Sequence, residues 1–176
     1  MIKKYIVFDR DGTIIHYKPY LHNPKDIKLM PGTKELLNNF LLHSNKLFLH
    51  TNQSGISRGF FSKKDVINCN TKMINLLGFD NNIFERICIA SELNISKHSY
   101  RKPSPLFGNE IIKKFKIEKT DLFYIGDNLS DLETAAKIGC QAFGVENPKL
   151  NQDISNNQYG FKTFKNLMEL NKFLYG

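Results

Sequence analysis

The sequence predicts an α/β fold in which a doubly wound parallel sheet forms a single domain without a separate cap domain. Short apolar runs of strand length alternate with segments whose apolar residues recur every three or four positions, which is the pattern of strand–helix–strand units. The chain has 176 residues, and a domain of that size holds a sizeable core. Polar residues directly follow several apolar runs, where open parallel sheets place their crevice.

Five apolar runs are the predicted strands, because each has the length of a strand and is followed by turn-forming or polar residues. The first run, Tyr5-Ile6-Val7-Phe8, is apolar throughout and ends at two acidic residues. Such a run is typical of a strand that is buried on both faces. The predicted strands span residues 5–8, 46–51, 86–90, 122–126 and 141–145.

Helical spacing of apolar residues predicts five helices between and after these strands. In residues 33–42 four apolar side chains share one face, and Thr33 is the predicted N-cap. Residues 62–77 are expected to begin at an N-cap, Ser62, and to stop at Gly78. The predicted helices span residues 33–42, 62–77, 105–115, 129–138 and 164–174.

The remaining segments are predicted loops of one domain that spans residues 1–176. Residues 14–31 contain prolines, tyrosines and other polar residues, which predicts a flap beside the crevice. Residues 91–100 form a short polar loop, and residues 146–160 are expected to be a surface loop without a function. Substrate specificity is therefore expected to depend on loops rather than on a cap domain.

Composition restricts the partners and the compartment of the protein. The formal net charge is +8, from 25 Lys and Arg against 17 Asp and Glu, and such a charge favours anionic ligands. The lysines are scattered and no aromatic platform accompanies them, so no nucleic-acid partner is expected. Three cysteines without a CxxC pair predict reduced thiols and a cytoplasmic protein. No apolar run approaches the ~20 residues that cross a bilayer, so no membrane association is expected.

Two carboxylates follow the first predicted strand, one residue apart. Asp9 and Asp11 would both reach the crevice, and Gly12 allows the sharp turn that brings them together. Two close acids repel each other unless a cation or a shared proton relieves them. The pattern therefore predicts a metal site or a nucleophile, whereas a merely turn-forming pair would not require the further groups described next.

Three further groups lie at or beyond other predicted strand ends. Thr51 begins the stretch that follows the second strand, Lys102 precedes a helix, and Asp127 follows the fourth strand. A nucleophilic carboxylate, a second carboxylate that moves protons, a hydroxyl, a fixed cation and a third carboxylate are what aspartyl-phosphate chemistry requires. The sequence therefore predicts phosphoryl transfer at this edge of the sheet.

These residues resemble the four motifs of the haloacid dehalogenase superfamily of phosphohydrolases, over residues 5–145. The resemblance implies a Rossmann-like fold of that superfamily. DRDGT at 9–13, TNQSGI at 51–56 followed by Arg58-Gly59, and RKP at 101–103 resemble one branch in particular. That branch contains the D-glycero-D-manno-heptose-1,7-bisphosphate 7-phosphatases and the histidinol-phosphate phosphatases.

The resemblance implies roles for individual residues. Asp9 would be the nucleophile, and Asp11 the general acid and base. Mg²⁺ would be held by Asp9, the main-chain oxygen of Asp11 and Asp127, which suits an ion that prefers oxygen ligands and keeps several waters. The expected substrate-binding residues are Thr51, Asn52, Arg101 and Lys102.

Three of these residues keep a second interpretation. Asp131, one helical turn after Asp127, either orients Lys102 or the metal waters, or is an acid favoured by the dipole at the start of a helix. Asn52 either contacts substrate or forms a turn. Arg101 either binds substrate, as the matching arginine does in this branch, or is a solvated charge.

The expected function is that of a Mg²⁺-dependent phosphomonoesterase that hydrolyses a small phosphorylated metabolite through an aspartyl-phosphate. The first candidate substrate is D-glycero-D-manno-heptose 1,7-bisphosphate, with histidinol phosphate second and a polynucleotide 3′-phosphate third. A phosphate-binding or receiver-like protein is the alternative without catalysis. The presence of Asp11 argues against this alternative, because a stable aspartyl-phosphate requires that no general base stands two residues after the nucleophile.

The sequence also departs from this branch. Many members carry a zinc loop with three Cys and one His before the RKP motif, whereas here that region contains Cys88 and His98 alone. Four tetrahedral ligands cannot be assembled from two residues, so no zinc is predicted. The residue after Asp127 is Asn128, where close relatives commonly have a basic residue. A monomer is expected.

Overall fold

Six parallel strands form one sheet in the order β3-β2-β1-β4-β5-β6. The computed structural model describes residues 3–80, 82–96, 98–147 and 154–176. All five strand pairs are parallel, and β1 pairs with β2 on one side and β4 on the other. The strands are β1 (Tyr5–Phe8), β2 (Lys46–Asn52), β3 (Phe84–Ala90), β4 (Leu122–Gly126), β5 (Gln141–Val145) and β6 (Lys162–Phe164).

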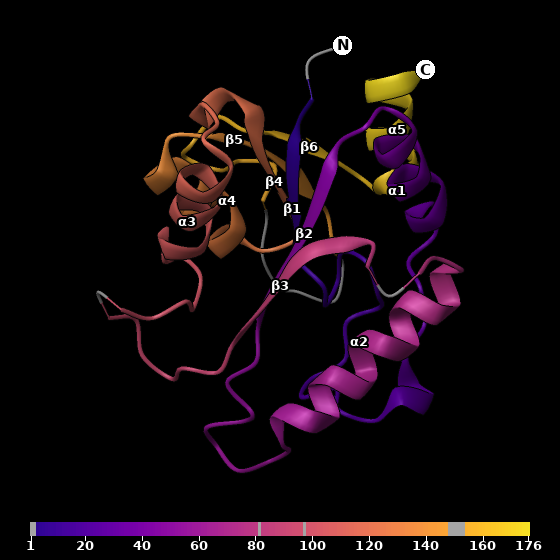
Figure 1. The fold of residues 1–176 in the computed structure, drawn as a ribbon, viewed down its shortest axis with the longest axis vertical. Helices are drawn as coiled ribbons and strands as arrows, with labels where there is room; N and C mark the ends of the chain where they lie inside the picture. Colours follow the sequence, from indigo (N-terminus) through magenta and orange to yellow (C-terminus); the bar gives the residue numbers. More distant parts are fainter. Residues whose placement is uncertain (1–2, 81, 97, 148–153) are drawn as a thin grey trace.

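Helices cover both faces of the sheet, as Figure 1 shows, with α1 and α5 together on one side and α3 and α4 on the other. The predicted doubly wound α/β class is therefore confirmed. The helices are α1 (Thr33–Leu42), α2 (Lys63–Leu77), α3 (Leu106–Phe115), α4 (Leu129–Ile138) and α5 (Leu167–Tyr175), with 3₁₀ turns η1 (Pro24–Asp26) and η2 (Lys119–Asp121).

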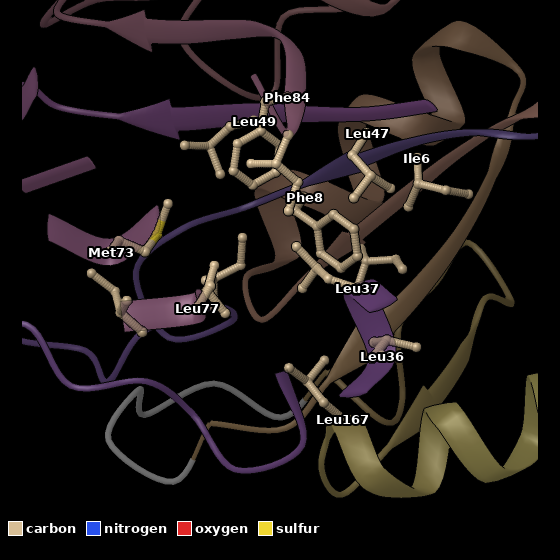
Figure 2. Packing of buried hydrophobic residues seen from close by; sticks show 14 of the residues in the cluster. Ile6, Phe8, Leu36, Leu37, Leu47, Leu49, Met73, Leu77, Phe84 and Leu167 are labelled. Carbon is tan, nitrogen blue, oxygen red and sulfur yellow. The ribbon is translucent and has the colours of Figure 1, made fainter. Parts of the chain in front are cut away.

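The strands divide their side chains between two apolar clusters, one on each face of the sheet. Ile6 and Phe8 of β1 join the cluster under α1, α2 and α5, whereas Val7 joins the cluster under α3 and α4. Figure 2 shows the first cluster, in which Phe8 lies between strand residues and the helix residue Leu37. Because both faces are buried, the central strands read as continuous apolar runs.

Most predicted boundaries agree with the structure to within three residues. Ser62 caps α2 through a capping box with Asp65, and Gly78 ends that helix in the left-handed conformation with φ 74°. The predicted N-cap of α1 was wrong, because Gly32 occupies that position. The hydroxyl of Thr33 instead donates to the carbonyl oxygens of Met30 and Ile14, which ties the helix to the flap.

Strand β6 was not predicted. It has three residues, of which Phe164 alone is buried, so its apolar content is too small for a strand signal. It pairs with β5 at the edge of the sheet. The predicted surface loop 146–160 lies in part outside the described residues.

The predicted flap starts from a tight turn at the end of β1. The main-chain N–H groups of Ile14 and Ile15 both donate to the carbonyl oxygen of Arg10 at 3.0 Å. The side chains of Ile14 and Ile15 are fully buried in the core. The base of the flap is thus fixed, while its outer part, residues 17–20, faces the carboxyl edge of the sheet.

The order of the strands determines where a crevice opens. From β1 the chain proceeds to β2 and β3 on one side, and β4 returns to the other side of β1. The switch point of this sheet lies between β1 and β4, and ligands of open α/β sheets bind outside the carboxyl ends of the strands there. Among the described residues, no helix combines the length and the apolar character required to cross a membrane.

Candidate active site

Asp9 and Asp127 directly follow β1 and β4, the two strands at the switch point. The main-chain N–H of Asp9 donates to the carbonyl oxygen of Ile125 at 2.8 Å, so the two strand ends remain in register. Asp9 is 8% exposed and Asp127 is 2% exposed. Both carboxylates therefore meet at the carboxyl edge of the sheet and are largely removed from water.

Lys102 lies between these strand ends and binds two carboxylates. Its Nζ is 2.6 Å from Oδ1 of Asp9 and 2.5 Å from Oδ1 of Asp131. The other oxygen of Asp131 accepts from the main-chain N–H of Asn128 in the capping box of α4. Asp131 therefore does both things that the sequence suggested as alternatives: it orients Lys102, and it stands at the start of α4, where it completes the capping box.

A glycine allows Asp131 to pack this closely. A Cβ atom on Gly126, the last residue of β4, would lie 2.2 Å from the carboxyl carbon of Asp131. No real side chain tolerates such a distance, so the strand end must lack one. The carboxylate can therefore lie directly against the end of β4.

The site carries more negative than positive charge. Asp9, Asp127 and Asp131 are all buried, and each offers a carboxylate oxygen within 4.8 Å of the others. Burial raises the pKa of Asp127 to about 7, and Asp131 adds to the rise. Burial also raises the pKa of Asp9 well above its usual value, although Lys102 opposes the rise. Burial disfavours the charged Lys102, but Asp131 and Asp9 outweigh it and raise the lysine pKa.

This arrangement fits a divalent cation with oxygen ligands. Because both oxygens of Asp131 are already bound, Asp9 and Asp127 are the carboxylates that could hold it. A Cβ on Gly12 would lie 1.9 Å from Oδ2 of Asp127. The main chain after Asp11 thus approaches Asp127 closely. Two carboxylates, together with waters and the main-chain oxygen of Asp11 that the resemblance implies, suit Mg²⁺.

The carboxylate of Asp11 is held by three donors on its own side of the crevice. Gln53 donates to its Oδ2 at 2.9 Å and the Thr51 hydroxyl at 3.2 Å. Arg10, which is fully buried, pairs with it at 2.9 Å and also donates to Asn70 of α2. Asp11 therefore has a defined position although it lies in a turn.

Residues at the end of β2 hold the segment that carries Lys102. The side chain of Asn52 accepts from the main-chain N–H of Lys102 at 2.9 Å and donates to its carbonyl oxygen at 3.2 Å. His50, which is fully buried, donates from Nε2 to the carbonyl oxygen of Tyr100 at 2.8 Å. Burial lowers the pKa of His50 to about 3, with a further contribution from the charge of Lys102. The histidine is therefore neutral and acts as a fixed donor.

Two adjoining cavities open at this edge. The inner one, of about 160 Å³, is lined by Asp9, Asp11, Thr51, Asn52, Lys102 and Asp127, among others. The outer one, of about 280 Å³, lies between the flap residues 17–21 and the residues that follow β2. Asp11, Tyr17 and Asn52 line both. The site thus has a small charged compartment joined to a larger one.

A larger cavity of about 410 Å³ lies away from this site. Its walls are mainly apolar and include Phe40, Phe123 and Tyr175, between the sheet and helices α1 and α5. No acidic residue lines it. We therefore place the chemistry at the carboxyl edge, despite the smaller volume there.

Comparison with known proteins places the chain in a family. The model of a family described as haloacid dehalogenase-like hydrolases matches residues 7–145. The chain belongs to the haloacid dehalogenase-like hydrolases. The matched segment contains Asp9, Lys102 and Asp127, the residues that meet around the inner cavity.

Relatives of this hydrolase are named as sugar-bisphosphate phosphatases. A D-glycero-alpha-D-manno-heptose-1,7-bisphosphate 7-phosphatase of Campylobacter jejuni is 30% identical over 175 residues, 98% of this chain and 96% of that protein. A D-glycero-beta-D-manno-heptose-1,7-bisphosphate 7-phosphatase of Rhodopseudomonas palustris is 30% identical over 145 residues, 78% and 81% of the two chains. These relatives confirm the resemblance drawn from the motifs.

A solved structure shows the same fold. The D,D-heptose 1,7-bisphosphate phosphatase from B. bronchiseptica, complexed with magnesium and phosphate, superposes with a TM-score of 0.85. The match covers 97% of each chain at 23% sequence identity. At this identity the likeness shows the fold of this hydrolase.

The structure gathers most of the predicted site residues of this hydrolase. Arg101 is the exception, because it does not line either cavity and its Nη1 lies 3.5 Å from the carbonyl oxygen of Glu92. Sequence reasoning missed the contributions of Arg10, Gln53 and Asn147. Arg10 stands between two acids and Gln53 belongs to the TNQSGI motif, so a search for partners of Asp11 would have found both.

The neutral His50 predicts a pH dependence of stability. The unfolded histidine binds a proton below its usual pKa of 6.5, whereas the buried one does not. The unfolded state therefore binds more protons, and this contribution to the free energy of unfolding falls as the pH decreases from about 6.5 toward about 3. In the His50→Gln variant, which keeps a donor for Tyr100, chemical denaturation at several pH values should show a smaller fall. The exposed His98 provides the control, and an equal change in His98→Gln would contradict the account.

Proposed function

We propose that this hydrolase is a Mg²⁺-dependent phosphomonoesterase that removes the 7-phosphate of D-glycero-D-manno-heptose 1,7-bisphosphate. The observation that carries the proposal is the meeting of Asp9, Asp127 and Lys102 around one small cavity at the switch point. An excess of buried carboxylates has no benefit for stability. It does provide a site for a cation and an anionic nucleophile.

Asp9 is the proposed nucleophile. Lys102 binds its Oδ1, so Oδ2 attacks phosphorus while the bond from phosphorus to the substrate oxygen breaks. Water then attacks phosphorus, which releases inorganic phosphate and restores the Asp9 carboxylate. When bound to Asp9, Asp127 and the Asp11 carbonyl, Mg²⁺ supplies positive charge that reduces repulsion between nucleophile and phosphate. Lys102 neutralises charge on the phosphate oxygens.

Asp11 is the proposed general acid and base. It lines both cavities, so it stands where the phosphate meets the rest of the substrate. It donates a proton to the departing oxygen in the first step and accepts one from water in the second. Such help is worth about 10²- to 10⁴-fold in rate. This position favours turnover over a receiver-like function that stores the aspartyl-phosphate.

The outer cavity is the proposed compartment for the sugar. Tyr20 and Phe61 line it, and each is backed by a ring from the opposite segment. Tyr20 contacts Phe60 edge to face with centroids 4.8 Å apart, and Phe61 stacks on His22 at 5.4 Å. Aromatic rings beside polar groups suit a polyhydroxylated ring that presents both C–H and O–H groups. The two pairs also join the flap to the loop after β2.

The Asp9→Asn variant tests the nucleophile. Phosphate release with Mg²⁺ should fall by about 10³-fold or more, because the amide cannot attack phosphorus. The melting temperature of the metal-free protein should not fall, since the change removes one of three buried negative charges. Asp121→Asn, which removes a carboxylate paired with Lys4 away from the site, serves as the control and should keep full activity. Persistent activity of Asp9→Asn would contradict the assignment.

A substrate panel tests the specificity. Both anomers of D-glycero-D-manno-heptose 1,7-bisphosphate, histidinol phosphate and a 3′-phosphorylated oligonucleotide are compared by kcat/KM at one Mg²⁺ concentration. The heptose bisphosphate should be the best substrate, because the outer cavity is walled by aromatic and polar groups of the flap. Equal and feeble rates on all of them, or a preference for the oligonucleotide, would contradict the proposal.

The Phe60→Ala variant tests the sugar compartment. Phe60 is 55% exposed, so its loss should leave the fold intact, while Tyr20 loses the ring that backs it. An aromatic pair contributes about 0.5–1.5 kcal/mol, so KM for the heptose bisphosphate should rise by roughly 2- to 12-fold with little change in kcat. Leu42→Ala, a change at an exposed residue of α1, should leave KM unchanged. An equal rise with glycerol phosphate, which is too short to reach this wall, would contradict the role.

Zinc is not part of the proposal. Cys88 is buried in β3, and burial raises the pKa of its thiol to about 12, which disfavours the thiolate that zinc requires. His98 is exposed in the loop that follows. The absence of zinc and the monomeric state stay predictions.

A further inference from the structure

We propose that Asn147 is a positioning residue that fixes the carboxylate of Asp127 and thereby sets the affinity of the site for Mg²⁺. The inference rests on the proposed function, because it concerns the same metal site. It adds a residue that follows β5 to a site that otherwise uses the ends of β1, β2 and β4 and the segment that carries Lys102. Residue 147 belongs to none of the sequence motifs and falls in the segment that was expected to be a loop without a function.

The side chain of Asn147 binds Asp127 directly. Its Nδ2 donates to Oδ2 of Asp127 at 2.6 Å, and both side chains are buried. Asn147 lies two residues beyond the end of β5, and Gly144 of β5 pairs with Gly126 of β4. The chains that leave these neighbouring strands therefore run side by side, which brings residue 147 to residue 127.

The hydrogen bond selects one oxygen of Asp127. Asn147 occupies Oδ2, whereas Oδ1 has a long contact of 3.5 Å with the Thr13 hydroxyl. Oδ1 can therefore bind a cation while Oδ2 stays anchored by Asn147. An amide suits this task, because it donates a hydrogen bond without adding a charge that would compete with the metal.

The turn after β1 closes the arrangement from the other side. A Cβ on Gly12 would lie 2.4 Å from Nδ2 of Asn147 and 1.9 Å from Oδ2 of Asp127. The main chain of Gly12 thus packs against the amide–carboxylate pair. Residues from the ends of β1, β4 and β5 meet at one point, and a rotation of the Asp127 carboxylate would require all of them to move.

A residue with a purely structural role would affect the stability of the protein and not its affinity for metal. Asn157, in the same connection between β5 and β6, ties that loop together through hydrogen bonds to Ile154 and Phe161. It lies outside the metal site. Asn157→Ala is therefore the matched control, because it should lower the melting temperature and leave the affinity for metal unchanged.

Calorimetric titration of the metal-free full chain with Mg²⁺, and with Mn²⁺ as a second probe, tests the inference. Loss of a hydrogen bond that orients a metal ligand typically weakens binding by about 10- to 100-fold, and Asn147→Ala should do so. Asn147→Leu, which keeps the approximate shape but has no hydrogen-bond donor, should also weaken binding and provides the test if the alanine variant does not fold. At saturating Mg²⁺ the kcat of Asn147→Ala should return to within a few-fold of the wild-type value.

The outcomes separate this inference from the proposed function. If the wild-type chain binds Mg²⁺ and folded Asn147→Ala binds it equally well, the positioning role is wrong and the phosphatase proposal stands. If kcat of Asn147→Ala stays low at saturating Mg²⁺ while the dissociation constant is unchanged, the role is also wrong. If the wild-type chain binds neither Mg²⁺ nor Mn²⁺, both the metal site and the role of Asn147 fail.

Discussion

The buried excess of negative charge at the ends of β1 and β4 is the constraint on which the rest of the site depends. Lys102 binds Asp9 and Asp131, but it compensates only part of the charge of three buried carboxylates. Burial raises the pKa of Asp127 to about 7, which shows how poorly the site tolerates that carboxylate without a cation. Costly arrangements of this kind are typical of functional sites, and the proposed phosphoryl transfer accounts for this one.

Hydrogen bonds from neighbouring residues fix the segment that carries Lys102 and the carboxylate of Asp131. Asn52 forms two hydrogen bonds with the main chain of Lys102, and His50 donates to the carbonyl oxygen of Tyr100. The capping box of α4 occupies the second oxygen of Asp131. Because most of these supports use neutral amide or imidazole groups, they add rigidity without changing the charge of the site. The acidic cluster is therefore positioned by a scaffold that does not itself compete for a cation.

The sequence predicted the fold because its local signals agree with one another. Buried strands appear in the sequence as continuous apolar runs, and Ser62 and Gly78 mark the ends of a helix that the structure reproduces. Strand β6 escaped prediction because three residues with one buried side chain give no periodic signal.

The site was predictable where polar residues follow a strand directly, as for Asp9 and Asp127. Asn147 lies two residues beyond β5 among other polar loop residues, so the sequence does not distinguish it, and only its distance to Asp127 does. Whether Asn52 contacts substrate or supports Lys102 also depends on the orientation of its side chain, which the sequence does not contain.

A crystal of the protein soaked with Mn²⁺, with the ion located by its anomalous scattering, tests the central claim most directly. The account predicts one strong peak bound by Asp9, Asp127 and the main-chain oxygen of Asp11, with Lys102 still bridging Asp9 and Asp131. A peak that displaces Lys102 from Asp131, or the absence of any peak at this edge of the sheet, would contradict it.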